Sequence, residues 1–276
     1  MCLLRLLPIL LFAGLNLAAQ ATEPRLFELG VVPYLPTSNL ITAYQPLRAH
    51  LEEKLNRPVA LTTAPDFGTF LERCLRKEYD MIVLGPGLGR YAQVEAGYQP
   101  LAVARRNIKA LFIVERSAPY VRLQDLSGKR LAMLDPITGL SQLGMERLRA
   151  AGMQPERDYS VRLVNTPSNA IHAVLQEEAE AGVITANLMP QLDADTKRRL
   201  RILDESREIP GIMFLLHPAD PRQSRRIKDL LLQFADAEAG RNFMLSAALD
   251  GLRIPTAQEL QALDGFLPEI RRRLRR

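Results

Sequence analysis

Short apolar runs alternate with amphipathic stretches along the chain from about residue 26. Apolar runs bounded by turn residues predict buried strands, whereas apolar positions that recur every three or four residues predict helices. Their alternation predicts parallel βαβ units with helices on both faces of each sheet. Strands are expected at Leu26–Val32, Pro58–Thr62, Met81–Leu84, Leu101–Ala104, Ala110–Val114, Arg130–Leu134, Tyr159–Val164, Gly182–Thr185, Arg201–Leu203 and Ile212–Leu216.

Cap and turn residues set the limits of the predicted helices. Asp66 stands where an N-cap is expected, and Gly97 follows a helical stretch as a C-terminal glycine does. Glycine-containing turns at residues 85–87 and 135–139 each separate a strand from a helix, and the chain after Pro221 is mostly helical in its spacing. Helices are expected at Ala43–Leu55, Asp66–Lys77, Leu140–Ala151 and Thr166–Ala179, and from the first glycine turn to Ala96.

The same pattern is repeated in the second half, so the sequence predicts two α/β units followed by a helical tail. Polar stretches near Val103–Ile108 and Leu203–Gly211, the latter with its polar connection Asp204–Pro210, predict two crossovers between the units. Two crossovers return the tail to the first unit. The expected fold class is therefore α/β with two lobes, a cleft and a hinge, each lobe being an open, mostly parallel sheet. The expected divisions are 1–21 for a signal peptide, 22–106 with 211–276 for one lobe, and 107–210 for the other.

Several predicted helices begin at the expected cleft. Ligands of open α/β sheets bind outside the carboxyl ends of the strands. The helices that follow Gly85, Pro136 and Pro167 would present free backbone N–H groups and a positive dipole end there. This arrangement favours an anionic ligand.

The N-terminal residues have the pattern of a secretory signal peptide. Arg5 is followed by an apolar run, Leu6–Leu15, and then by the small-x-small triplet that ends at Ala21. Cleavage after Ala21 and a periplasmic location are expected, with an uncleaved anchor as the alternative. The mature chain would keep one cysteine, Cys74, whose place in a helical pattern predicts a buried thiol.

Composition argues against several other kinds of protein. The formal charge is +5, yet residues 6–270 alone sum to −1, because Arg5 and five C-terminal arginines carry the excess. The basic end is interpreted as a solvated helix terminus, with a membrane-surface or partner contact as the alternative. Trp is absent and aromatic residues are 6%, which disfavours a nucleic-acid partner. Two cysteines and three histidines are too few for the usual metal sites, so no metal or cofactor is expected.

Several segments resemble the phosphate/phosphite/phosphonate-binding proteins of ABC transporters, which are type II periplasmic binding proteins. The first half of the chain carries the strand that leads to Pro33, then AYQPL with a long helix, APDF, and an apolar strand that ends in GPG. The second half carries LSGKRLAMLDPITG, NAIHAV, IPG and, near the end, LDGLRIP. The resemblance covers essentially the whole mature chain in order.

This resemblance implies a monomeric periplasmic solute-binding protein that captures a small anionic, phosphonate- or phosphate-like ligand for an inner-membrane ABC permease. Phosphonate binders carry a Ser-Thr-Ser-Gly run in the turn after the DP pair, and here it is reduced to Ile137, Thr138 and Gly139. The aromatic residue that the family would have at the end of the third strand is replaced by Leu84, and Pro167–Asn169 stand where some members have histidine. The chemistry of the ligand is left open by these departures.

The candidate ligand-binding residues lie in loops and at helix starts near the expected cleft. Each has a structural alternative: core packing for the aromatic residues, turn geometry for the glycines and N-capping for the hydroxyl residues. The candidates are Tyr34, Phe67, Gly85, Pro86, Gly87, Thr138, Gly139, Ser141, Ser168, Asn169, Thr185 and Asn187.

No catalytic residue is expected. The chain lacks the G-x-S-x-G elbow, the H-E-x-x-H zinc motif, a Walker A loop and C-x-x-C. Two alternatives to an importer subunit stay open: a ligand-sensing subunit for a membrane signalling receptor such as a kinase, and a periplasmic enzyme on the same fold.

Overall fold

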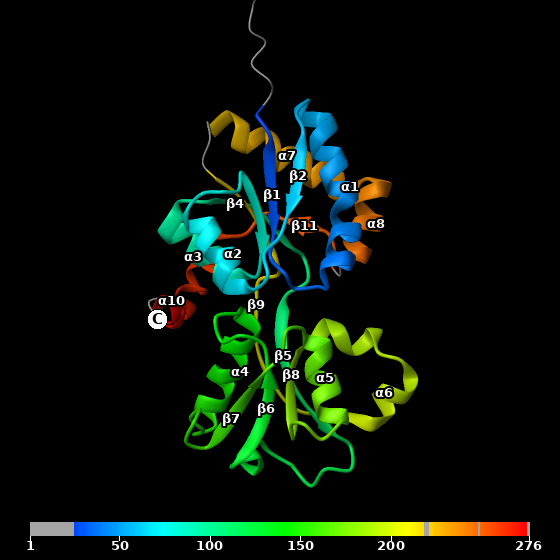
Figure 1. Cartoon of the computed structure of the whole chain (residues 1–276), viewed down its shortest axis with the longest axis vertical. Coiled ribbons are helices and arrows are strands. Elements are labelled where there is room, and N and C mark those ends of the chain that lie inside the picture. Colours follow the sequence, from blue (N-terminus) through cyan, green and yellow to red (C-terminus); the bar gives the residue numbers. More distant parts are fainter. Residues whose placement is uncertain (1–24, 218–220, 248, 275–276) are drawn as a thin grey trace, which may run out of the picture.

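The computed structural model describes residues 25–217, 221–247 and 249–274. The expected signal peptide, residues 1–21, lies outside the described residues, as do Arg275 and Arg276. The described chain forms two β-sheets, each covered by helices and stacked along the long axis of the molecule (Figure 1). Each sheet with its covering helices is called a lobe below.

The first lobe contains a six-stranded sheet between two layers of helices. Side chains of β3 alternate between the layers, since Met81 and Val83 pack with α1, α7 and α8 whereas Ile82 and Leu84 pack with α2 and α3. The strand order is β11 (Leu252–Arg253), β4 (Gln99–Ala104), β10 (Met213–Leu216), β3 (Met81–Leu84), β1 (Phe27–Val31) and β2 (Val59–Thr62). The helices are α1 (Thr37–Leu55), α2 (Phe67–Leu75), α3 (Pro86–Ala96), α7 (Pro221–Asp236) and α8 (Glu238–Ser246).

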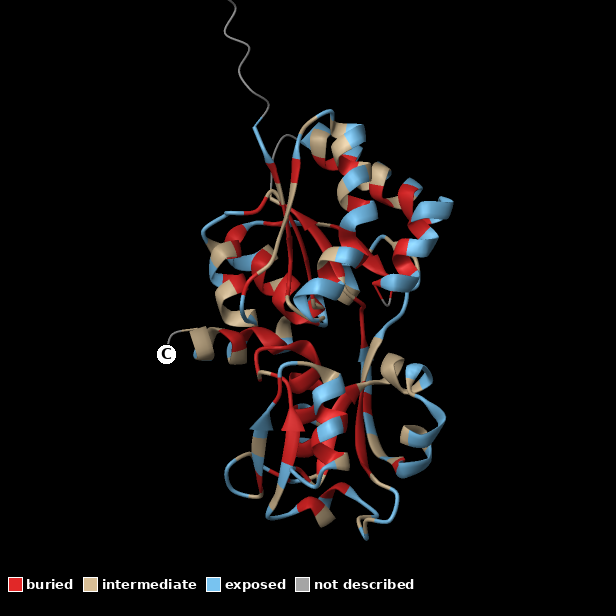
Figure 2. Ribbon diagram, turned by 45° about the vertical axis from the view of Figure 1, so that its right-hand side comes forward, coloured by how far each residue is buried: buried red, intermediate tan, exposed pale blue. Residues whose placement is uncertain are grey.

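The second lobe contains a five-stranded sheet with its own helices. Its apolar core is continuous with the α2–α3 side of the first lobe, so buried residues extend from one lobe to the other (Figure 2). The strand order is β7 (Tyr159–Leu163), β6 (Lys129–Met133), β8 (Ala181–Thr185), β5 (Ile108–Glu115) and β9 (Leu200–Ile209). The helical segments are η1 (Leu123–Leu126), α4 (Gly139–Ala150), α5 (Pro167–Leu175), η2 (Ala186–Gln191) and α6 (Ala194–Arg199).

The predicted two-lobed α/β architecture is confirmed, and each sheet differs from a purely parallel arrangement in having antiparallel strands as well. In the first lobe β1 pairs parallel with β2 and β3, whereas β10 is antiparallel to β3 and β4. In the second lobe β5 is antiparallel to β8 and β9. The crossovers explain the difference, because β5 and β10 each enter a lobe from the edge at which the parallel strands end.

Several predicted boundaries also needed correction. The stretch Asp204–Pro210 was expected to be a polar connection, but β9 continues to Ile209 and pairs with β5 over that length. Polar side chains are tolerated there because β9 is an edge strand. Helix α1 starts earlier than expected, at Thr37, and α5 ends earlier, at Leu175. The elements α6 and β11 were not predicted.

Two short crossovers run side by side between the lobes. They are residues 105–107, between β4 and β5, and residues 210–212, between β9 and β10. The Ala104 N–H donates a 2.8 Å hydrogen bond to the carbonyl oxygen of Ile212. A Cβ at Gly211 would lie 2.4 Å from the carbonyl oxygen of Arg106, so only glycine allows this close approach.

The C-terminal segment packs on α3 and reaches the second lobe. It contains α9 (Ala257–Gln261), η3 (Asp264–Phe266) and α10 (Leu267–Leu274). The guanidinium of Arg207, on β9, lies 5.5 Å from the centre of the Phe266 ring. Arg271 pairs with Glu95 at 2.7 Å, and the two arginines that follow it pair with Glu269.

No helix within the described ranges has the length and apolar character of a membrane span.

Candidate functional site

A cavity of about 330 Å³ lies between the lobes. Both lobes contribute to its walls, and Ile108 at the start of β5 and Ile212 in the second crossover lie at the hinge end. The other lining residues are Val32, Tyr34, Leu35, Pro36, Phe67, Gly85, Pro86, Leu88, Leu134, Thr138, Gly139, Leu140, Asn165, Thr166, Pro167, Ser168, Asn169, Thr185, Asn187, Leu188, Gln191, Ala247 and Leu249.

The wall from the first lobe is apolar. Its members follow β1, begin α2 and α3, or follow α8. Phe67 is held at the start of α2 because the Asp66 carboxylate accepts a 2.7 Å hydrogen bond from the Thr69 N–H, which confirms Asp66 as an N-cap. Val32, Leu35 and Leu88 add aliphatic surface.

Tyr34 contributes its ring to this wall, while its hydroxyl is engaged within the first lobe. The hydroxyl donates a 3.0 Å hydrogen bond to the Ala247 carbonyl oxygen. Since that bond uses its single proton, the contact with the Tyr44 hydroxyl at 3.0 Å must be donated by Tyr44. Burial, partly offset by the hydrogen bond with Tyr44, raises the pKa of Tyr34 to about 12. The pair is therefore neutral at physiological pH.

Apart from Tyr34, the polar side chains of the lining belong to the second lobe, where they stand beside aliphatic residues such as Leu134 and Leu188, and none of them is charged. The Thr166 hydroxyl caps α5 by accepting from the Asn169 N–H, and the Thr185 hydroxyl caps η2 by accepting from the Asn187 N–H, both at 3.2 Å. Within the described part of the chain, the side chains of Asn165, Ser168 and Asn169 make no hydrogen bond and are exposed. The amide and hydroxyl groups of these three side chains are therefore available to donate hydrogen bonds to a ligand.

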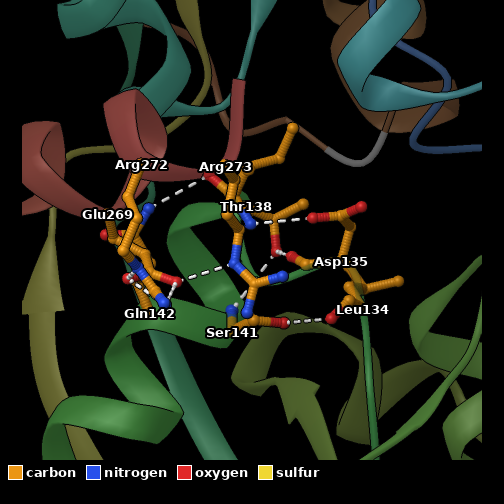
Figure 3. Close-up of polar contacts among 9 residues, drawn as sticks. Leu134, Asp135, Thr138, Ser141, Gln142, Glu269, Arg272 and Arg273 are labelled. Carbon is orange, nitrogen blue, oxygen red and sulfur yellow. Dashed lines mark hydrogen bonds and ion pairs between the residues drawn. The ribbon is translucent and has the colours of Figure 1, made fainter. Parts of the chain in front are cut away.

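The start of α4 also lines the cavity, and Figure 3 shows the polar contacts made there. The Thr138 hydroxyl donates to the Asp135 carbonyl oxygen at 2.8 Å and accepts from the Ser141 N–H at 3.3 Å. The buried Ser141 hydroxyl donates to the Leu134 carbonyl oxygen at 2.8 Å. Thr138 thus caps the helix, and its proton is already used. The same figure shows Arg272 and Arg273 directed to Glu269 rather than to these groups.

The two lobes are in contact where α3 and α4 begin. A Cβ at Gly139 would lie 3.7 Å from the Gly87 backbone nitrogen and 3.8 Å from Pro86 Cγ. Gly85 precedes α3 without a side-chain cap. Two helix N-termini, each a positive dipole end, therefore meet at the cavity, and an anion there would stabilise the arrangement.

Most of the predicted binding residues are brought together at this cavity. The exceptions are Ser141, which is buried behind Thr138, and Gly87, which packs between Gly139 and the Phe266 ring. The other predicted residues line the cavity: Tyr34, Phe67, Gly85, Pro86, Thr138, Gly139, Ser168, Asn169, Thr185 and Asn187.

Sequence reasoning missed part of the lining. Asn165 and Thr166 directly precede α5, which begins at Pro167, so the helix-start argument applied to Ser168 could have included them. Ala247 and Leu249 follow α8 and carry no local signal of a binding role. Only the return of the tail to the first lobe places them beside Tyr34.

Charged side chains are absent from the described lining residues. Asp66 caps α2, and Asp135 accepts from the Ile137 N–H at 2.9 Å in the turn before α4. The described ranges also contain no group of three or more His, Cys, Asp or Glu side chains suited to a metal ion. Cys74 is buried in the first lobe, as predicted, and burial raises the pKa of its thiol. The cavity is therefore suited to binding through dipoles, hydrogen bonds and apolar contact.

The fold is shared with solved binding proteins. XAC2383 from Xanthomonas citri, bound to chloride ion, is 19% identical with a TM-score of 0.79, covering 90% of this chain and 99% of that one. PhnD1 from Prochlorococcus marinus (MIT 9301), in complex with methylphosphonate, is 12% identical with a TM-score of 0.80 and the same coverage.

The sequence matches one characterised protein over a short stretch and one protein family over most of its length. A 90-residue stretch is 29% identical to the tetrathionate sensor histidine kinase TtrS of Salmonella typhimurium, and it spans 32% of this chain but only 15% of the kinase. Residues 29–260 match the family described as ABC transporter, phosphonate, periplasmic substrate-binding protein. The chain therefore belongs to the family of periplasmic substrate-binding proteins of phosphonate ABC transporters.

Proposed function

We propose that this protein captures a small oxyanion in the cavity between its lobes and presents the closed, loaded form to an ABC permease in the inner membrane. The observation that carries the proposal is the cavity itself, which both lobes line and which lies at the starts of α3, α4 and α5. Backbone N–H groups and positive dipole ends at helix starts are suited to an anion.

Closure would occur about the paired crossovers, residues 105–107 and 210–212. Rigid units at 22–106 with 211–276 and at 107–210 would rotate against each other, as in other hinge-closing binding proteins. The close approach of Pro86 to Gly139 and the contact of Arg207 with Phe266 both join the lobes without using the ligand. These contacts support a closed form that a permease could recognise as a single surface.

The remaining elements of the proposal follow from family membership and sequence. The protein would act in the periplasm after cleavage behind Ala21, as a monomer that performs no chemistry on its ligand and binds no nucleic acid. Intact-mass measurement of exported protein tests the cleavage, with a mature chain expected to begin at Thr22.

Native mass spectrometry followed by small-angle scattering tests the capture. The mature protein is expected to retain a stoichiometric small molecule from the producing cell. Removing that molecule should increase the radius of gyration, and restoring it should reverse the change. A stripped protein whose scattering profile is the same with and without the molecule would contradict capture by closure.

A sensing role is the second candidate, and the short match to a sensor histidine kinase favours it. The loaded protein would then engage a membrane receptor instead of a permease. The neighbouring genes distinguish the two roles: permease and ATPase genes support import, and a signalling gene supports sensing.

A further inference from the structure

We infer that the ligand is a small oxyanion with an apolar substituent, and that the cavity discriminates against ligands carrying a cationic amino group. This inference rests on the proposed function, since it names the class of ligand for the same cavity.

The two walls of the cavity differ in chemistry. The free side-chain donors all belong to the second lobe, at the start of α5 and after β8. The facing wall is formed by Val32, Leu35, Phe67 and Leu88, and the one hydroxyl there, on Tyr34, is hydrogen-bonded to Ala247 and Tyr44. An oxyanion placed against the donors therefore has its substituent directed at hydrocarbon.

Nothing in the described lining can neutralise an ammonium group. The carboxylates that adjoin lining residues in the chain are already engaged: Asp66 and Asp135 accept hydrogen bonds from backbone N–H groups, and Asp250 pairs with Arg106 at 3.4 Å. The start of α4 adds a positive dipole end, which repels a cation. A buried ammonium without a paired anion is strongly unfavourable, so a zwitterionic ligand would lose affinity.

The size of the cavity limits the substituent. A volume of about 330 Å³ is near the lower end of the roughly 300–1,000 Å³ typical of small-molecule sites. A headgroup with a chain of a few carbons fits such a volume. Each methylene moved from water to the apolar wall should tighten binding about fourfold.

An isosteric pair of probes tests the discrimination. Butylphosphonate and 3-aminopropylphosphonate have the same number of heavy atoms and differ in a terminal methyl or ammonium. Calorimetry on the stripped protein should give butylphosphonate at least roughly tenfold tighter than its amino counterpart. Inorganic phosphate should bind more weakly than butylphosphonate, and butanesulfonate shows whether the headgroup must be a phosphonate.

Negative charge placed on the apolar wall should reduce or remove the preference for butylphosphonate. Leu35→Asp, in the loop after β1, is expected to reduce the ratio of the two affinities by about tenfold or more. Phe67→Asp is a second variant in case the first does not fold, because an acidic residue suits the first turn of α2. The control is Leu245→Asp on α8, where Leu245 is 78% exposed and outside the cavity, and it should leave the ratio unchanged.

The outcomes separate this inference from the proposed function. Equal affinities, or tighter binding of 3-aminopropylphosphonate, would overturn the inference while leaving capture by closure intact. Folded aspartate variants with an unchanged ratio would overturn the assignment of the apolar wall. If no probe binds, the inference fails, and the ligand retained in native mass spectrometry then decides whether the proposed function fails with it.

Discussion

The hydroxyl oxygens of Tyr34 and Tyr44 lie 3.0 Å apart, and Tyr44 is the donor because Tyr34 donates its own proton to Ala247. This hydrogen-bonded chain joins the loop after β1 to α1 and to the residue that follows α8. It fixes the Tyr34 ring as a wall of the cavity and leaves its hydroxyl without a proton for a ligand.

Tyr34→Phe should therefore affect stability more than binding. The substitution leaves the fully buried Tyr44 hydroxyl without its acceptor, which should lower the free energy of unfolding by about 1–3 kcal/mol. The affinity for butylphosphonate should change by less than about twofold, because the ring stays in place. Denaturant unfolding and calorimetry measure the two effects. A large loss of affinity with unchanged stability would show that the hydroxyl contacts the ligand.

Thr138→Ala should show the behaviour of a lost N-cap. The Thr138 side chain accepts from the Ser141 N–H at the start of α4, so its removal should cost about 1 kcal/mol of stability. Affinity should change by less than about threefold, because the hydroxyl proton belongs to the Asp135 carbonyl. Thr138→Ser keeps the cap and serves as the control. Loss of affinity in the alanine variant without loss of stability would assign Thr138 to the ligand instead.

A bulky substitution at Gly139 should prevent the two lobes from closing, whereas a small one should be tolerated. A Cβ there would make ordinary contacts, at 3.4 Å from Ile209 Cδ1 and 3.7 Å from the Gly87 nitrogen, so Gly139→Ala should be tolerated. Gly139→Val adds methyl groups between the lobes and should weaken binding by at least about tenfold. Scattering should show the valine variant open at ligand concentrations that close the parent protein. Gly265→Val is the control, because a Cβ at Gly265 meets no atom within 4 Å.

Gly211→Ala should destabilise the paired crossovers. The added Cβ would lie 2.4 Å from the Arg106 carbonyl oxygen and 2.8 Å from Ala104 Cβ. Separating the two segments to make room should lower the free energy of unfolding by about 1–3 kcal/mol. Gly265→Ala again provides the comparison. A variant as stable as the parent would mean that the crossovers can move apart without cost, which is contrary to the close contact seen here.

The C-terminal segment should carry a pH-dependent contribution to stability from Glu259. Hydrogen bonds from Arg253, helped by those from Thr256, lower the pKa of Glu259 to about 2. A lowered pKa in the folded state stabilises the protein above the ordinary value of 4.5, and this contribution is lost as the pH falls through about 2. Glu259→Gln should cost about 1–2 kcal/mol at pH 7, a figure reduced for partial exposure. The difference from the parent should shrink between pH 4.5 and 2, and a pH-independent difference would contradict the assignment.

Local sequence pattern determined much of the fold and part of the site. Asp66 and Gly97 were identified as helix boundaries because capping depends on neighbours within a few residues. The strand Met81–Leu84 matched the structure because a short apolar run between turns has few alternatives. Thr138 and Ser168 were placed at the cavity by the rule that helices begin where parallel strands end.

Other features were decided only by the tertiary structure. Strand β9 is polar enough to resemble a loop, and its ten residues are held by pairing with β5 rather than by a pattern of their own. The availability of the Tyr34 hydroxyl depends on Ala247, which is 213 residues away in the chain. Which donors are free for a ligand cannot be read from residue types, because each polar group bonds to whatever the folded chain brings within about 3 Å of it.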